Sequence, residues 1–199
     1  TMKNVLTAVA AIVLLAACSS TPQKKVVIMS SGKLSVNGDA VSFEPGTQHN
    51  EQTITLKGDK LTVTDPSGSK DYPVTEPGTW LLNLKKDTLI GSFQVFGEAG
   101  TREGRITQEQ MMQRMDSLQQ LMTGANVTAA RKNHFLAPND FKKITATDNA
   151  IVVGPFKGMP ASLQPDKKGN IPEVYKFISN KDARETLDRL EKMLKGTEE

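Results

Sequence analysis

Few residues of this 199-residue chain are of types that do chemistry, because it has one cysteine, two histidines and one tryptophan. His49 lies between Glu44 and Glu51, and imidazole and carboxylate groups are common metal ligands. The three residues follow no common metal-ligand motif, and turn-forming residues flank both His49 and His134. We therefore interpret His49 as a surface histidine and expect no metal site.

Four methionines lie close together, and their thioether sulfurs could bind copper(I). They are Met111, Met112, Met115 and Met122. Methionine also fills gaps in hydrophobic cores. Because Met111, Met115, Leu118 and Met122 recur at helical spacing, we interpret this stripe as the buried face of a helix that covers a sheet.

Signals for enzymatic catalysis are weak. The chain has no G-x-S-x-G motif. The S-x-x-K pattern of penicillin-binding enzymes occurs at residues 30–33 and 67–70, in predicted hairpin turns, without the S-D-N or K-T-G partner motif. We predict no catalytic residue, no cofactor and no enzymatic activity.

Charge argues against nucleic acid as a partner. The chain has 25 Lys and Arg against 22 Asp and Glu, a formal net charge of +3. These charges are spread over both halves, so no segment has the clustered positive field that phosphate backbones require. Aromatic residues make up only 5% of the chain, which disfavours a surface for stacking bases.

The N-terminus carries the strongest signal. A short basic start with Lys3 precedes residues 5–17, an uncharged apolar run that ends in Leu15-Ala16-Ala17-Cys18. The run is shorter than the about 20 residues that span a bilayer. This order resembles the lipobox signal peptide of bacterial lipoproteins, in which signal peptidase II cuts in front of a lipidated cysteine. Beyond it, we identify no family for the mature chain.

The resemblance implies that Cys18 is the site of lipid attachment and that the bilayer is the first partner. Acylation would consume the sole thiol, which excludes a disulfide, a thiolate nucleophile and a cysteine metal ligand. In enteric lipoproteins the residue directly after the lipidated cysteine directs sorting. By that resemblance, Ser19 rather than an aspartate at this position implies the outer membrane. Residues 19–23 contain no acidic cluster of the kind that marks surface export, which favours the periplasmic face.

The segment after the anchor has the pattern of β-strands. Residues 33–37, 52–57 and 60–65 alternate apolar and polar side chains, and Asn37-Gly38 and Gly58-Asp59 suit tight hairpin turns. We predict an antiparallel meander of about seven or eight strands, closed as a barrel or packed as a sandwich.

Two amphipathic helices follow. Thr107 with Gln110 forms a predicted capping box at the start of the first helix, which Gly124 ends. The second helix is capped by Ser179 and Asp182 and ends at Gly196. Short strands are predicted between the helices, at residues 150–153 and 174–178.

The predicted fold class is therefore α+β, with a β-rich part followed by a part that contains two helices and two or more short strands. The β-rich part and the helix-containing part can also form one domain together. The predicted boundaries are 1–17 for the signal peptide, 18–23 for a lipidated tether, 24–97 for the β-rich subdomain, 98–105 for a glycine-containing linker and 106–199 for the α+β subdomain.

Residues 154–173 form a predicted loop that contains four prolines. Loops this long are uncommon in compact domains and are usually functional or disordered. Prolines also reduce the entropy that a loop loses on binding. We predict a partner-binding loop with Phe156, Met159, Leu163 and Ile171 as its apolar contacts.

These features predict a membrane-anchored lipoprotein of the cell envelope that acts as a non-catalytic binding or accessory module facing the periplasm, with an envelope protein as partner. An alternative comes from Gly78-Thr79-Trp80, which is similar to the G-x-W motif of lipocalins. That resemblance implies a carrier that holds a small apolar ligand in a barrel cavity.

Overall fold

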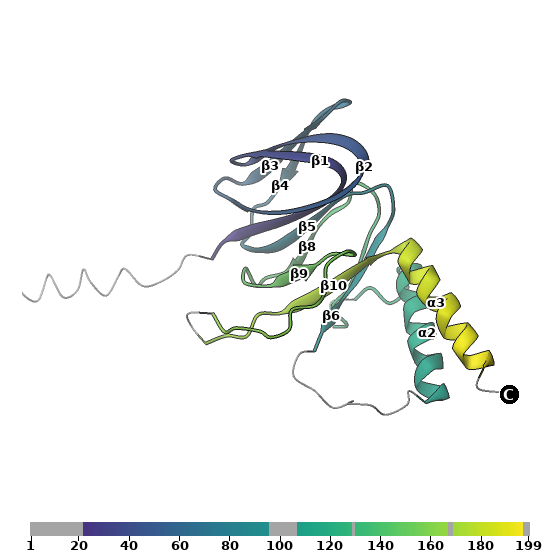
Figure 1. The fold of residues 1–199 in the computed structure, drawn as a ribbon. Coiled ribbons are helices and arrows are strands. Elements are labelled where there is room, and N and C mark those ends of the chain that lie inside the picture. Colours follow the sequence, from purple (N-terminus) through teal and green to yellow (C-terminus); the bar gives the residue numbers. More distant parts are fainter. Residues whose placement is uncertain (1–21, 96–106, 129, 167–168, 197–199) are drawn as a thin grey trace, which may run out of the picture.

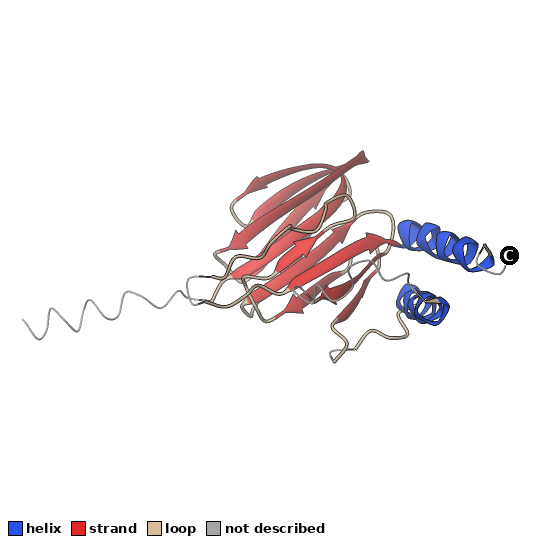
Figure 2. Ribbon diagram, turned by 60° about the horizontal axis from the view of Figure 1, so that its bottom comes forward, coloured by secondary structure: helices blue, strands red, loops and turns tan. Residues whose placement is uncertain are grey.

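The computed structural model describes residues 22–95, 107–128, 130–166 and 169–196. These residues form a curled six-stranded sheet, a four-stranded sheet and a pair of helices at one end of the second sheet (Figures 1 and 2). The predicted α+β class is confirmed, with a barrel-like β-rich part first and a second sheet and two helices after it.

The first sheet has the strand order β4-β3-β2-β1-β5-β8. Its strands are β1 (Lys24–Asn37), β2 (Ala40–Leu56), β3 (Lys60–Asp65), β4 (Gly68–Pro73), β5 (Gly78–Leu84) and β8 (Phe141–Thr145).

The second sheet has the order β7-β6-β10-β9. Its strands are β6 (Leu89–Gln94), β7 (Asn133–Leu136), β9 (Ile151–Val153) and β10 (Val174–Ser179), and the helices are α2 (Gln108–Met122) and α3 (Asn180–Lys195).

The first sheet is mixed, although an antiparallel meander was the expectation. β1 pairs with β2 in antiparallel fashion but with β5 in parallel, and β2 pairs with β3 in parallel. The β2–β3 pair is parallel because the β1–β2 ribbon curls back on itself. β3 therefore lies beside the start of β2 rather than beside its end, with Ala40 opposite Thr62.

A bulge in the β1–β2 ribbon marks the bend. The pairing passes from Ser31 opposite His49 to Gly32 opposite Pro45, so three residues of β2 have no counterpart on β1. Gly32 has a φ of +137°, and a Cβ atom there would lie 2.0 Å from the carbonyl oxygen of Glu44. Only glycine fits this position, because any side chain would collide with the partner strand.

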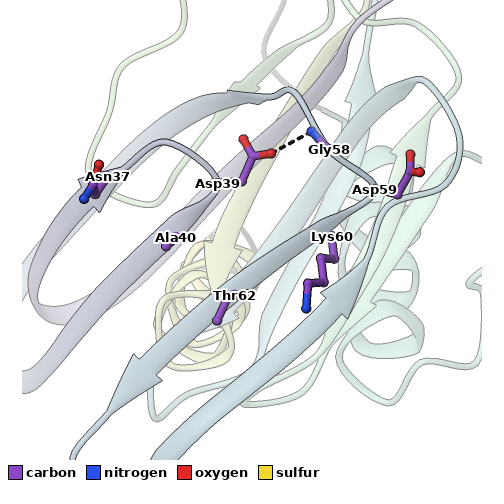
Figure 3. A pocket seen from close by; sticks show the side chains of 7 residues that line it. All are labelled: Asn37, Asp39, Ala40, Gly58, Asp59, Lys60 and Thr62. Atoms are coloured by element: carbon purple, nitrogen blue, oxygen red, sulfur yellow. Dashed lines mark hydrogen bonds between the residues drawn. The ribbon is translucent and has the colours of Figure 1, made fainter.

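Two sets of contacts close the curl. The carboxylate of Asp39, in the β1–β2 turn, accepts hydrogen bonds from the backbone N–H groups of Lys57 and Gly58, which follow the far end of β2. Figure 3 shows the bond from Gly58. At the two edges of the sheet, Tyr72 of β4 and Phe141 of β8 have ring centroids 5.3 Å apart. The sheet is therefore barrel-like and nearly closed.

The middle strand β1 is buried on both faces. Val26 and Ile28 point into the core of the curled sheet, whereas Val27 and Met29 point into a second core that lies between the two sheets. All four side chains are at most 2% exposed. Each such burial stabilises the fold by about 1.5–3 kcal/mol.

The two halves of the chain share both sheets. β8 comes from the C-terminal half and pairs with β5, whereas β6 comes from the N-terminal half and pairs with β7 and β10 (Figure 1). The predicted linker at 98–105 lies outside the described residues.

Both predicted capping boxes are confirmed. The Thr107 side chain accepts from the N–H of Gln110, and the Ser179 side chain accepts from that of Asp182. Each N3 side chain returns a hydrogen bond to the backbone of its cap residue. These bonds satisfy N–H groups that have no partner within the helix.

The buried face of α2 includes the predicted stripe and also Leu121. Met111 and Leu121 are its buried residues, and Met115, Leu118 and Met122 are half-buried. Leu121 packs with Ile90 of β6 and Ala183 of α3. The helix thus packs on its neighbour helix as well as on the sheet, so its buried face is wider than predicted.

We expect Leu121→Ala to lower the free energy of unfolding by about 2–5 kcal/mol, because it leaves a cavity between α2, α3 and β6. Met112→Ala is the matched control on the same helix, since Met112 is 54% exposed, and it should change the value by about 0.5 kcal/mol or less. Urea denaturation of both variants measures the difference, and equal effects would contradict this packing.

Candidate functional site

The predicted lipid attachment residue Cys18 lies outside the described residues. The body of the protein begins close to it, because the backbone of Gln23 is already fixed. The N–H of Gln23 donates to Asp148 Oδ2 at 2.7 Å, and its carbonyl accepts from the N–H of Gly78 at 2.9 Å. None of the helices in the described part of the chain is long and apolar enough to span a membrane.

The predicted partner-binding loop has no helix or strand in its described parts, residues 154–166 and 169–173. Phe156 is 68% exposed, Ile171 is 67% exposed and Met159 is 39% exposed, whereas Leu163 is half-buried. Three of the four predicted contact residues are thus exposed apolar side chains. Exposed apolar groups gathered on one segment are typical of binding surfaces.

The start of the loop is attached to β2. The Phe156 ring lies against the His49 ring, with centroids 4.5 Å apart, and Lys157 Nζ lies 3.0 Å from Glu51 Oε1. A Cβ atom on Gly154 would lie 2.3 Å from the other oxygen of Glu51. The absence of a side chain at 154 therefore lets the backbone approach the carboxylate closely.

Lys176 of β10 holds the same stretch of the loop from the other side. Its ammonium group donates to the carbonyl oxygens of Gly154 at 2.8 Å and of Lys157 at 2.7 Å. Burial lowers the pKa of Lys176, and the carboxylates of Glu51 and Asp182 oppose that effect. The ammonium group and the carbonyls therefore fix the backbone turn after β9.

His49 lies beside the start of the loop and is half-buried, whereas the sequence predicts a surface histidine. Its side chain is 20% exposed, and Lys85 Nζ lies 3.0 Å from its Nδ1. Since an ammonium group can only donate, Nδ1 is the acceptor and Nε2 carries the hydrogen. Nε2 lies 3.8 Å from Glu51 Oε2, and neither atom has a hydrogen-bond partner.

The surroundings of His49 determine its protonation state. Burial lowers the pKa of His49, and Lys85 lowers it further, so the imidazole is kept neutral against the pull of Glu51. Lysine ammonium groups lie next to His49 Nδ1 and Glu51 Oε1, and they place positive charge on two sides of the cluster. Among the described residues, no group of three His, Cys, Asp or Glu side chains could hold a metal ion.

The far end of the loop lies beside the start of the body. Asp166 accepts hydrogen bonds from the backbone N–H of Asn170 and from the side chain of Asn149. A groove of about 800 Å³ runs here, and its described lining includes both Ile171 and Gln23. One exposed apolar residue of the loop is therefore at the end of the molecule from which the chain continues toward Cys18.

The other motifs have structural positions. Ser30 is fully buried within β1, so residues 30–33 form part of a strand and not the predicted turn. Residues 67–70 cover the β3–β4 turn and the start of β4, as predicted. Trp80 lies on β5 and stacks on Phe141, with centroids 5.1 Å apart.

No family model, curated protein or solved structure matches this chain.

We expect Glu51→Ala to loosen the start of the loop, because the variant removes the buried acceptor of Lys157. The free energy of unfolding should fall by about 1–3 kcal/mol, and trypsin should cleave faster after Lys157. Glu44→Ala is the control, since Glu44 lies on the same strand and is exposed. Equal cleavage rates for both variants would show that Glu51 does not hold the loop.

Proposed function

We propose that this protein is a lipid-anchored lipoprotein of the bacterial cell envelope that acts as a non-catalytic binding or accessory module on the periplasmic face of the outer membrane. The observation that carries the proposal is the lipobox-like sequence that ends at Cys18, followed closely by the first strand.

The short connection supports a position next to the membrane. Residues 19–22 lie between Cys18 and the hydrogen-bonded Gln23. Four extended residues reach about 14 Å. Two or more acyl chains on Cys18 would hold the anchor in the bilayer, since each buried CH₂ contributes about 0.8 kcal/mol. A partner would therefore be a neighbour in the membrane or in the adjacent periplasm.

The loop 154–173 supports a binding role. It presents Phe156, Met159 and Ile171 to solvent, while polar contacts at its two ends hold it on the body. A loop that is already positioned loses less entropy on binding than a free one. The most economical assignment is therefore that an envelope protein docks on these side chains.

An apolar-ligand carrier is the less favoured function. Twelve buried residues pack into one cluster on the concave side of the curled sheet, and Phe43, Leu61 and Leu82 are among them. A ligand would have to displace these well-packed side chains. The G-x-W residues 78–80 begin β5 rather than the first strand of the sheet.

We expect Cys18→Ser to remain an uncleaved precursor that a fatty-acid probe does not label, because the peptidase acts on the lipidated cysteine. Ser19→Asp is the control: it should be labelled and cleaved, but should move to the inner-membrane fraction on density centrifugation. Normal maturation and labelling of Cys18→Ser would refute the anchor.

We expect the double variant Met159→Ser/Ile171→Ser to fold normally and to reduce the yield of the envelope protein that crosslinks to the native chain in membranes. Met112→Ser is the control, because Met112 is an exposed apolar residue far from the loop in sequence. Equal crosslinking of all three proteins would remove the loop from the binding surface.

A further inference from the structure

Charged side chains crowd around His49 where the partner-binding loop begins. Lys85 Nζ lies 3.0 Å from Nδ1 of His49, and the carboxylate of Glu51, which is 4% exposed, lies near Nε2. Lys157 Nζ lies 3.0 Å from Glu51 Oε1. Two ammonium groups and one carboxylate therefore face the imidazole, and a proton on His49 would add a third positive charge.

A proton on Nδ1 is incompatible with the contact between His49 and Lys85. In the structure Nδ1 is the acceptor, because an ammonium group can only donate. Once the imidazole is protonated, both of its nitrogens carry hydrogen and neither can accept. Two cations would then face each other across one short contact, so the Lys85 side chain must move away.

The other nitrogen of His49 has a position ready for the new charge. Nε2 lies 3.8 Å from Glu51 Oε2, and neither atom has a hydrogen-bond partner among the described residues. A small movement of the ring brings the two atoms within hydrogen-bond distance. Because a bond between an imidazolium and a carboxylate is stronger than one from a neutral imidazole, protonation draws His49 toward Glu51.

Lys85 has a second position available to its side chain. Asp87 and Asp182 attract its ammonium group, and Asp182 lies in the first turn of α3. The backbone of Lys85 is fixed, because its N–H donates to the side chain of Asn83, which is fully buried and donates in turn to the carbonyl of Asp87. A change at His49 therefore turns the Lys85 side chain toward α3 and leaves the main chain in place.

Both changes weaken the contacts that hold the loop on the body. Lys85 Nζ lies 5.3 Å from the centre of the Phe156 ring, and this cation–π contact is lost when Lys85 turns away. Lys157 is 57% exposed, and its attraction to Glu51 falls once the imidazolium pairs with the same carboxylate. Water can then replace the Lys157 contact, because an exposed ammonium group is already largely hydrated.

The neutral imidazole is the form that the folded chain favours. Burial lowers the pKa of His49 below the ordinary value of 6.5, Lys85 and Lys157 lower it further, and Glu51 opposes them. The contacts are therefore complete above pH 6.5 and weaken as the pH falls below it. Lys176 of β10 also faces Glu51, but its bonds to backbone carbonyls of the loop do not depend on His49.

We propose that His49 is a pH-sensitive switch whose protonation loosens the start of the partner-binding loop, residues 154–157, from the body of the protein. Only the consequence for binding rests on the proposed function: an envelope partner would meet a differently arranged Phe156 in acid. The switch itself needs neither the lipid anchor nor a partner. A measurement on the isolated chain therefore tests the switch, whereas crosslinking in membranes tests the proposed function.

The first experiment follows the histidine ring signals of the untagged full-length chain by NMR as the pH is lowered from 8. We expect His49 to titrate below 6.5. Lys85→Met should raise the pKa of His49, because it removes the ammonium group next to Nδ1. Lys86→Met is the control, since Lys86 is the exposed neighbour and its loss changes the net charge equally. The same pKa for His49 in both variants would overturn the proposal.

The second experiment measures hydrogen exchange of the Lys157 amide, which donates to the carbonyl of Gly154 at 3.2 Å. His49→Asn is the control, because asparagine offers Lys85 an acceptor oxygen near the position of Nδ1 but does not titrate. The ratio of the two exchange rates at one pH cancels the intrinsic effect of pH on exchange. We expect this ratio to rise about threefold or more as His49 is protonated. A ratio that stays constant through the His49 titration would overturn the proposal.

Discussion

The burial of β1 on both faces is the constraint on which the rest of the structure depends. Four successive apolar residues, Val26 to Met29, alternate between the core of the curled sheet and the core between the sheets. A strand with apolar side chains on both faces is unstable if either face is exposed to solvent, so other parts of the protein must cover both faces of β1. β5 has the same property, because Leu81 and Leu82 belong to different cores. The N-terminal strand β1 therefore contributes side chains to both cores.

The core between the sheets is bordered by two polar clusters. At one margin Glu51 and His49 meet the lysines that hold the loop, and at the other Glu173 is satisfied by Lys132 and two hydroxyl groups. Carboxylates removed from water require such partners.

Local chemistry explains why several elements could be predicted from the sequence. The Thr107 and Ser179 capping boxes depend on side chains three residues apart, so no distant part of the chain is needed to form them. The alternating pattern at Lys60–Asp65 similarly predicts a strand with one buried face. Exposure of Phe156 and Ile171 also followed from local signals, because closely spaced prolines prevent regular pairing.

Tertiary structure alone decided the rest. β4, β7 and β8 have no strong alternation of their own, and they form because a neighbouring strand offers hydrogen bonds to their edges. The parallel β2–β3 pair depends on the curl at Gly32, and the contact of Lys157 with Glu51 joins residues about a hundred positions apart in the chain. The sequence by itself determined caps, periodicity and the lipobox pattern, which are local, whereas the sites formed by distant segments required the fold that brings them together.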